Sequence, residues 1–326
     1  MSPETAVRVV DALDEGLTYV ESISIHFYGG EPLINLRPIE AILKRSKEKK
    51  TGRFSFAVTT NGTCFSKAAF ALLEEGKFQV ILSIDGPAEI HDECRQTAEG
   101  APTHARVMRF LSALRSQTTC RVRASAVVRS GWKLYQATEY LSKLPVDVIK
   151  AQAVRGPEGT PYTLSKTEKL DYLRDLEKIG RQVIAELEAG QIPKDDRFTN
   201  RILQLLKGDH RDAFCGAGYI NFGVTPPGDI VPCVLMDPEG CHLGHVNDDP
   251  KVWVNAGRRW KESQVVRSEC KACSSYRLCG GGCPAMIPIC GSDECDITRK
   301  NCEIAVAIYE LFRSKPEALL ALVGIT

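Results

Sequence analysis

Apolar residues in the first half of the chain recur with two different spacings. Helical spacing predicts helices over residues 3–17, 37–47, 66–75, 107–115 and 135–144. Short apolar runs between them predict strands over residues 22–28, 53–59, 80–84, 121–128 and 146–151. Ser2 is a candidate N-cap for the first helix, and Gly76 is expected to end the third.

This alternation predicts the α/β class, with a parallel sheet that curls toward a barrel. Polar loops follow the predicted strands, and several of them contain glycine. Active sites of barrels form at the carboxyl ends of the strands. We therefore expect these loops to contribute to one site.

The pattern changes in the second half of the chain. A long amphipathic helix is predicted over residues 166–189, with Ser165 and Glu168 as a capping box. Loops rich in glycine and proline follow, with short strands over residues 219–224 and 230–231. A final helix over residues 301–312 would place Ile304, Ile308 and Leu311 on one face. We predict a boundary near residue 205, which divides the chain into domains 1–205 and 206–326.

Composition excludes some classes of function. The chain has 326 residues, 43% hydrophobic and 25% charged, with a net charge of +1. This balance gives no overall bias toward nucleic acid or an anionic membrane. No apolar run approaches the length that spans a bilayer. Thirteen cysteines without an apolar signal core at the N-terminus predict a reducing, cytoplasmic location.

Seven cysteines of the last third form a dense array. Cys215 and Cys233 flank Gly228 in the spacing C-x12-G-x4-C. The remaining five are Cys270, Cys273, Cys279, Cys283 and Cys302. Cys is scarce and reactive, so thiols this dense indicate a soft metal or an iron–sulfur cluster. Three glycines, 280–282, permit a tight backbone whose amides can turn toward the sulfurs.

Three other interpretations of the cysteines compete with a cluster. A disulfide framework would need an oxidising compartment, and a chain of this length has no need of it. A zinc site is the stronger rival, although zinc ribbons repeat short C-x2-C knuckles and this array staggers its spacings. The third interpretation is packing, which suits Cys64, Cys94 and Cys120 because they have no partner spacing.

Two signatures together resemble a known family. The cysteine array resembles the SPASM domain, which binds auxiliary [4Fe–4S] clusters in radical S-adenosylmethionine (SAM) enzymes. The upstream motifs resemble the partial (βα)6 barrel of that superfamily. They are Phe27-Tyr28-Gly29-Gly30-Glu31-Pro32-Leu33, Thr59-Thr60-Asn61-Gly62 and Ser83-Ile84-Asp85-Gly86-Pro87, followed by His91, Asp92 and Arg95. The resemblance covers nearly the whole chain.

The resemblance implies a set of SAM-binding residues. Gly29, Gly30, Glu31 and Pro32 would contact the amino group of the methionyl part, and Ser83 and Asp85 the ribose. Asn61, Arg123 and Ser125 complete the set, the last two toward the carboxylate or ribose. Simpler interpretations stay open: a strand–turn–helix joint for the glycine loop, a solvated strand face for Arg123 and Ser125, and a helix start for His91 and Asp92.

The resemblance also assigns the cysteines. Cys270, Cys273, Cys279 and Cys302 would hold an outer cluster, and Cys215, Cys233 and Cys283 an inner one. The fourth inner ligand stays open between Cys241, Cys290, Cys295 and a substrate. Sulfatase maturases of this family carry an Asp directly after the second cysteine of the array, where this chain has Val234. That difference argues against formylglycine formation and favours another peptide modification.

One family motif is missing from the sequence. The superfamily holds its SAM-cleaving cluster on a C-x3-C-x2-C loop after the first barrel strand, and no such spacing occurs here. We therefore expect a barrel without its first strand, and a chain that does not cleave SAM alone. A preceding segment or a partner subunit would complete it, and would cover the otherwise open edge of the strand over residues 22–28.

Our leading hypothesis is a peptide- or protein-modifying radical SAM/SPASM protein of the maturase type, a class of oxidoreductase. It implies SAM, two auxiliary [4Fe–4S] clusters, a peptide or protein substrate, and an electron donor such as ferredoxin or flavodoxin. The second hypothesis is a non-catalytic iron–sulfur scaffold, an electron-transfer protein or a peptide-binding partner. The third is a zinc-bound structural module.

Overall fold

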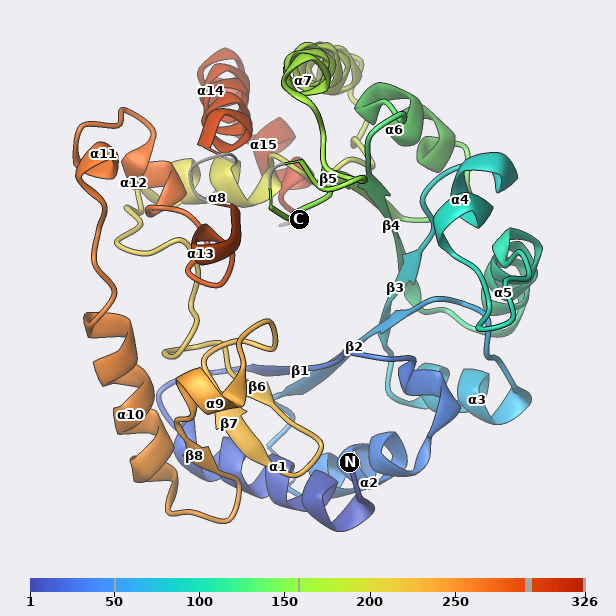
Figure 1. Cartoon of the computed structure of the whole chain (residues 1–326), viewed down its shortest axis with the longest axis vertical. Coiled ribbons are helices and arrows are strands. Elements are labelled where there is room, and N and C mark those ends of the chain that lie inside the picture. Colours follow the sequence, from blue (N-terminus) through green and yellow to red (C-terminus); the bar gives the residue numbers. More distant parts are fainter. Residues whose placement is uncertain (50, 158, 291–294, 325–326) are drawn as a thin grey trace. The chain divides into compact units, whose positions relative to one another are not determined.

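The computed structural model describes residues 1–49, 51–157, 159–290 and 295–324. Five strands form one sheet in the order β1-β2-β3-β4-β5 (Figure 1). They are β1 (Ile23–Phe27), β2 (Phe54–Thr60), β3 (Gln79–Ser83), β4 (Arg121–Val128) and β5 (Val148–Ala153). The pairs β1–β2 and β4–β5 are parallel. The α/β class and the parallel sheet are therefore as predicted.

Helices alternate with these strands. The first group is α1 (Pro3–Gly16), η1 (Pro32–Ile34), α2 (Arg37–Glu48), α3 (Lys67–Glu75), α4 (Ala88–Cys94), α5 (His104–Gln117) and α6 (Leu134–Ser142). The later group is α7 (Lys166–Glu188), α8 (Thr199–Lys207), α9 (Pro238–Cys241), α10 (Pro250–Glu262), α11 (Ser268–Lys271), α12 (Tyr276–Cys279), α13 (Ile287–Cys290), α14 (Cys295–Phe312) and α15 (Pro316–Leu322). A small antiparallel sheet of β6 (Gly223–Val224), β7 (Asp229–Val231) and β8 (Gly244–His245) lies in the cysteine-rich part.

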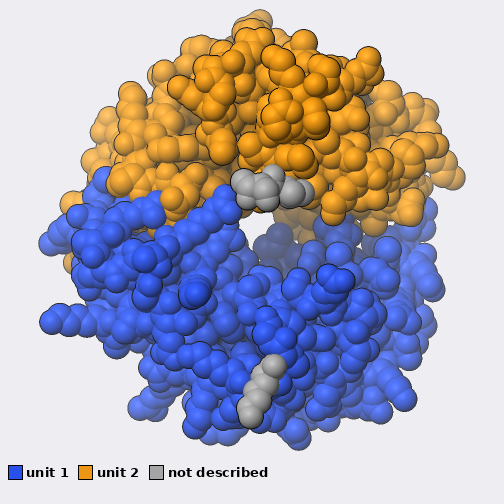
Figure 2. All heavy atoms as spheres, turned by 180° about the vertical axis from the view of Figure 1, so that it is seen from behind, with its two compact units in different colours: residues 1–81, 108–121, 215–265 blue, residues 82–107, 122–214, 266–326 orange. Residues whose placement is uncertain are grey.

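Contacts divide the chain into two compact units (Figure 2). Unit 1 comprises Met1–Ile81, Met108–Arg121 and Cys215–Val265. Unit 2 comprises Leu82–Val107, Val122–Phe214 and Val266–Thr326. Each unit therefore combines part of the α/β region with part of the cysteine-rich region.

The core of unit 1 joins α1 and β1 to the small sheet and α10. Trp253 of α10 is fully buried in a cluster with Val10, Ile23 and Ile230. Gly16 ends α1 against this ring, since a Cβ there would lie 2.3 Å from Trp253 Cζ2. The segment that carries Cys215 and Cys233 is thus anchored on the first helix of the chain.

The core of unit 2 lies between strands β4 and β5 and their covering helices. Alternate residues of β4 are buried, which leaves Arg123, Ser125 and Val127 on the other face. Helix α7 contacts α14 at Gly180, where a Cβ would lie 2.6 Å from Ile304. The predicted face of α14 is partly wrong, because Leu311 is 59% exposed while Ile308 is fully buried.

Helix ends follow the expected capping chemistry with one exception. Ser2 accepts from the Thr5 N–H at 3.1 Å, and the capping box of Ser165 and Glu168 is present. Gly76 follows α3, but its φ is −86°, and the left-handed residue is Lys77. Glycine is needed at 76 for space, because a Cβ would lie 2.4 Å from the Phe78 ring.

Within the described ranges, no helix combines the length and the apolar character that a membrane crossing requires.

Candidate functional site

The loop after β1 turns on two glycines. Gly29 and Gly30 have φ of 92° and 51°, which disfavours any side chain with a Cβ. No atom lies within 4 Å of a Cβ built at either position, so the requirement is conformational and the backbone is open to a ligand.

Glu31 joins this loop to the end of β2. Its carboxylate accepts from the Thr60 hydroxyl at 2.8 Å, the Asn61 N–H at 2.7 Å and the Leu33 N–H at 3.1 Å. Two predicted cofactor residues, Glu31 and Asn61, are thus brought together. A carboxylate has about four acceptor positions, so roughly one stays available for a donor of a ligand. Thr60 was not among the predicted site residues, although its place in the TTNG run was a signal.

Asp85, after β3, is bound within the protein. Arg95 reaches its carboxylate with Nε at 2.6 Å and Nη2 at 3.2 Å, and the Val127 N–H donates at 2.9 Å. The Trp132 indole donates to the Asp85 carbonyl at 3.1 Å. Asp85 is only 8% exposed, so this geometry makes it a residue that positions the β3 loop. Ser83, at the end of β3, is half-buried.

His91 and Asp92 have structural contacts. His91 is 0% exposed, and its Nδ1 accepts from the Asp85 N–H at 3.3 Å. Its Nε2 lies 3.1 Å from the Thr103 hydroxyl. Burial lowers the pKa of His91 to about 4, so the ring is neutral near pH 7. His91 and Asp92 lie inside α4 and not at a helix start, so that interpretation is wrong. Asp92 instead accepts from the N–H groups of Thr103 and His104, at the start of α5.

Arg123 and Ser125 lie on the partly exposed face of β4. Arg123 forms an ion pair with Asp196, and the Ser125 carbonyl accepts from the Ile84 N–H at 3.0 Å. Asp196 lies 73 positions away in the sequence, and no local pattern indicated it. Burial raises the pKa of Asp196, and Arg123 opposes this effect. The Arg123 guanidinium is therefore held by an internal partner.

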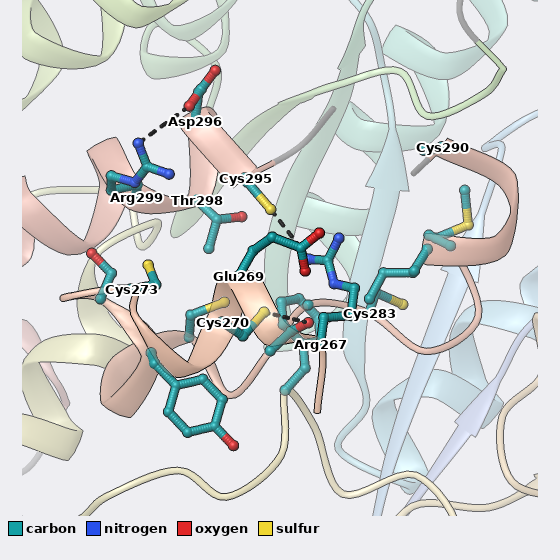
Figure 3. A pocket seen from close by; sticks show the side chains of 18 residues that line it. Arg267, Glu269, Cys270, Cys273, Cys283, Cys290, Cys295, Asp296, Thr298 and Arg299 are labelled. Carbon is teal, nitrogen blue, oxygen red and sulfur yellow. Dashed lines mark hydrogen bonds and ion pairs between the residues drawn. The ribbon is translucent and has the colours of Figure 1, made fainter. Parts of the chain in front are cut away.

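Six thiols surround one cavity of about 250 Å³ in unit 2 (Figure 3). They belong to Cys270, Cys273, Cys279, Cys283, Cys290 and Cys295. Four of these six belong to the predicted array, and the other two were candidates for the open ligand position. None of the thirteen cysteines, all of which lie in the described ranges, forms a disulfide.

The glycine triplet after α12 shapes the wall of this cavity. Gly280, Gly281 and Gly282 all have positive φ, at 75°, 94° and 89°. A Cβ at Gly280 would lie 2.2 Å from the Ala213 carbonyl carbon. Burial raises the pKa of Cys279, while the N–H groups of Gly281 and Gly282 point at its sulfur and oppose the rise. The predicted turn of backbone amides toward a sulfur is confirmed.

Two arginines donate to thiols at this site. Arg267 Nη2 lies 3.3 Å from Cys295 Sγ, and Arg201 Nε lies 3.1 Å from Cys302 Sγ. Cys302 is 1% exposed and does not line the cavity. The two guanidinium groups direct N–H donors at these two sulfurs.

The other cysteines fall in unit 1 or outside the array. Cys215, Cys233 and Cys241 belong to unit 1, and the Leu235 N–H points at Cys233 Sγ at 3.5 Å. The predicted inner set has members in both units and stays a prediction. Cys120 is buried and donates to the Leu73 carbonyl at 3.3 Å, which confirms its packing role.

The donor set fits an iron–sulfur cluster. Six thiols are distributed around one cavity, with backbone amides directed at one of them. Soft thiolates around a volume, with N–H donors to sulfur, are the environment of a polynuclear iron–sulfur centre.

Comparison with known proteins agrees with this site and fold. Residues 1–122 match the model of the radical SAM superfamily. The cysteine-type anaerobic sulfatase-maturating enzyme of Clostridium perfringens is 28% identical over 275 residues, which cover 80% of this chain and 73% of that protein. The serine-type enzyme of Bacteroides thetaiotaomicron is 30% identical over 119 residues, 35% of this chain and 28% of that protein.

A solved structure of a polyhistidine-tagged anSMEcpe with bound AdoMet has the same fold, with a TM-score of 0.80 and 21% identity over 99% of this chain and 88% of that chain. The chain therefore contains a radical SAM domain. It is homologous to the anaerobic sulfatase-maturating enzymes, and the resemblance found from the motifs is confirmed.

Proposed function

We propose that this chain is a radical SAM/SPASM protein that modifies a peptide or protein and holds auxiliary [4Fe–4S] clusters. One observation carries the proposal: six thiols surround a cavity in a chain that contains a radical SAM domain. Domains 1–205 and 206–326 would hold the cofactor site and the auxiliary clusters, respectively.

SAM would contact the loops that follow β1 and β2, the end of β3 with its loop, and one face of β4. The proposed residues are Gly29, Gly30, Glu31, Pro32, Asn61, Ser83, Asp85, Arg123 and Ser125. Their contacts within the protein suggest a different role for each of these residues in SAM binding. Gly29 and Gly30 offer open backbone, and Glu31 offers its remaining acceptor position. Asp85 would act by fixing the β3 loop through Arg95, and Ser83 would meet the ribose.

The clusters would use the array cysteines. We assign Cys270, Cys273, Cys279 and Cys302 to an outer cluster, and Cys215, Cys233 and Cys283 to an inner one. The fourth inner ligand is Cys241, Cys290, Cys295 or a substrate group. A reduced cluster and SAM, when bound, would supply radical chemistry for hydrogen abstraction from the substrate. The chain's own groups would position the cysteine sulfurs: Arg201 and Arg267 donate to sulfur, and the glycine triplet closes around Cys279.

A peptide substrate is supported by the structural relatives. "Native anSMEcpe with bound AdoMet and Kp18Cys peptide" has a TM-score of 0.75 at 22% identity over 99% of this chain and 91% of that chain. Val234 replaces the Asp of sulfatase maturases, so we propose a modification other than formylglycine formation. The one-electron chemistry calls for a donor such as ferredoxin or flavodoxin.

The test is anaerobic reconstitution with iron and sulfide, followed by iron analysis, absorption spectra and SAM binding. We expect brown iron–sulfur absorption and about two clusters per chain, because the array provides thiols for two. Cys270→Ser and Cys279→Ser should lose iron. The matched control Cys94→Ser, an exposed thiol outside the array, should retain it. A colourless zinc-loaded protein would contradict the proposal.

Assay for 5′-deoxyadenosine after dithionite reduction separates the catalytic form from the second hypothesis. Product above a cluster-free control supports catalysis by this chain. If the chain binds clusters and SAM but forms no product, a scaffold or electron-transfer role is favoured. That outcome would agree with the absence of a C-x3-C-x2-C spacing from this sequence.

A further inference from the structure

A second cavity in unit 2 is lined by positive charge. Its volume is about 410 Å³, within the range of about 300–1,000 Å³ that suits small ligands. It lies against β5, α7, α8 and α14. Six cationic side chains line it: Lys150, Arg155, Lys169, Arg197, Arg201 and Arg211. None of the described residues that line it is acidic.

The two acidic residues whose charges act on Lys150, Asp195 and Asp196, already have ion-pair partners. Arg197 and Asp195 form a buried ion pair at 2.6 Å, and Asp196 pairs with Arg123. Lys150 is the surplus cation. Burial is the main cause that lowers the pKa of its ammonium, Arg123 and Arg197 lower it further, and Asp196 opposes them. In the part of the chain that is described, no ion pair or hydrogen bond to Lys150 Nζ is formed, so an entering anion would be its first direct partner.

The remaining walls suit a peptide. Gln152, Asn200 and Asn301 offer side-chain amides, which pair with backbone N–H and C=O groups. Cations that recognise carboxylates, next to amides that recognise backbone, match an acidic peptide segment better than a small inorganic anion.

This cavity shares a wall with the thiol cavity. Phe214, Cys279, Cys290 and Thr298 line both. Arg201 lines the cationic cavity and donates to Cys302 Sγ at 3.1 Å. A segment held there would therefore lie beside the thiols. None of the nine proposed SAM residues lines this cavity in the described chain.

We propose that the cationic cavity binds the carboxylates of an acidic segment of the peptide substrate and so anchors the peptide beside the auxiliary clusters. This inference rests on the proposed peptide-modifying function. It adds the chemical class of sequence that the substrate carries.

The test is fluorescence anisotropy of labelled peptides on the reconstituted full chain. A Gly-Glu-Gly-Glu-Gly peptide should bind at least about tenfold more tightly than its Gln counterpart, and its affinity should fall with salt. Lys150→Met should weaken the acidic peptide about tenfold. It should leave the melting temperature unchanged or higher, because the variant removes a buried cation. The matched control Lys207→Met, an exposed cation on α8 outside the cavity, should change neither.

Equal affinity for the Glu and Gln peptides, or an unchanged affinity in Lys150→Met, would overturn the inference. Displacement of the acidic peptide by inorganic phosphate at equal concentration would overturn it in favour of a small-anion site. Iron content and SAM binding are measured on the same sample. Peptide selectivity without iron would contradict the proposed function alone, whereas iron and SAM binding without selectivity would contradict this inference alone.

Discussion

At the scale of single residues, several polar groups of the candidate site are already committed to the fold. Glu31 ties the β1 loop to the β2 end through three hydrogen bonds, and Asp85 holds Arg95 and the β4 backbone. In the proposed cofactor site, such residues would fix each loop against a neighbour before any cofactor binds. Substitution should therefore affect stability as well as binding.

Glu31→Gln tests this double role. The Gln side chain keeps one oxygen, so its NH2 group would face either the Asn61 N–H or the Leu33 N–H with the Thr60 hydroxyl, and at least one backbone donor would lose its acceptor. We expect a loss of about 1–3 kcal/mol in the free energy of unfolding, measured with urea. Glu21→Gln, an exposed substitution just before β1, is the control and should be neutral. Equal stability of the two variants would show that the Glu31 contacts carry no net energy.

His91 should make stability depend on pH. The folded protein holds the ring neutral with a pKa of about 4, against 6.5 for an unperturbed histidine. Its stabilising contribution is therefore complete above pH 6.5 and is lost as the pH falls toward 4. The full loss is about 3 kcal/mol for a shift of this size. Between pH 7.5 and pH 4.5, the free energy of unfolding measured with denaturant should fall more for the wild type than for His91→Gln. Equal decreases in the two proteins would refute the assigned role of His91.

At the scale of elements, periodicity identified most of the helices and strands that form the sheet, because burial on one face repeats at a fixed spacing. Among the elements that it missed are α8, α10, α15, β8 and the one-turn helices α9, α11, α12 and α13. For α10 a signal existed: Asp249 caps the helix and Pro250 starts it. The two-residue strands of the small sheet have too few positions for any period to appear.

Close contacts between elements leave no period in the sequence, and Gly257 of α10 is one such case. A Cβ at this position would lie 2.1 Å from the Gly218 carbonyl oxygen, which is backbone and cannot rotate away. We expect Gly257→Ala to destabilise the protein by about 1–3 kcal/mol in thermal or urea unfolding. Gly240→Ala is the matched control, since no atom lies within 4 Å of a Cβ there. Similar stability of both variants would mean that α10 shifts without penalty.

At the scale of the whole molecule, sequence spacing indicated iron–sulfur chemistry but left part of the ligand set open. The thiols of one cavity come from α11, α12, α13, α14 and the loops between them. Spacing along the chain does not specify which thiols lie close together. Their positions depend on the turn made by the glycine triplet and on the contacts of Arg201 and Arg267 with sulfur, which the sequence pattern does not show. Cys302 was assigned to the outer cluster by resemblance, whereas Cys295 lines the cavity and Cys302 contacts Arg201 behind it.

Alkylation footprinting combined with substitution identifies the cluster ligands and separates Cys302 from Cys295. Iodoacetamide treatment before and after anaerobic cluster loading, read by mass spectrometry, reports which thiols a cluster protects. We expect protection of Cys270, Cys273 and Cys279, and continued reaction of the exposed Cys94, because bound thiolates cannot attack the reagent. Cys302 is buried before loading, so substitution decides its role. Loss of iron in Cys302→Ser with retention in Cys295→Ser supports the proposed outer set. The opposite result would identify Cys295, at the start of α14, as the fourth ligand in place of Cys302.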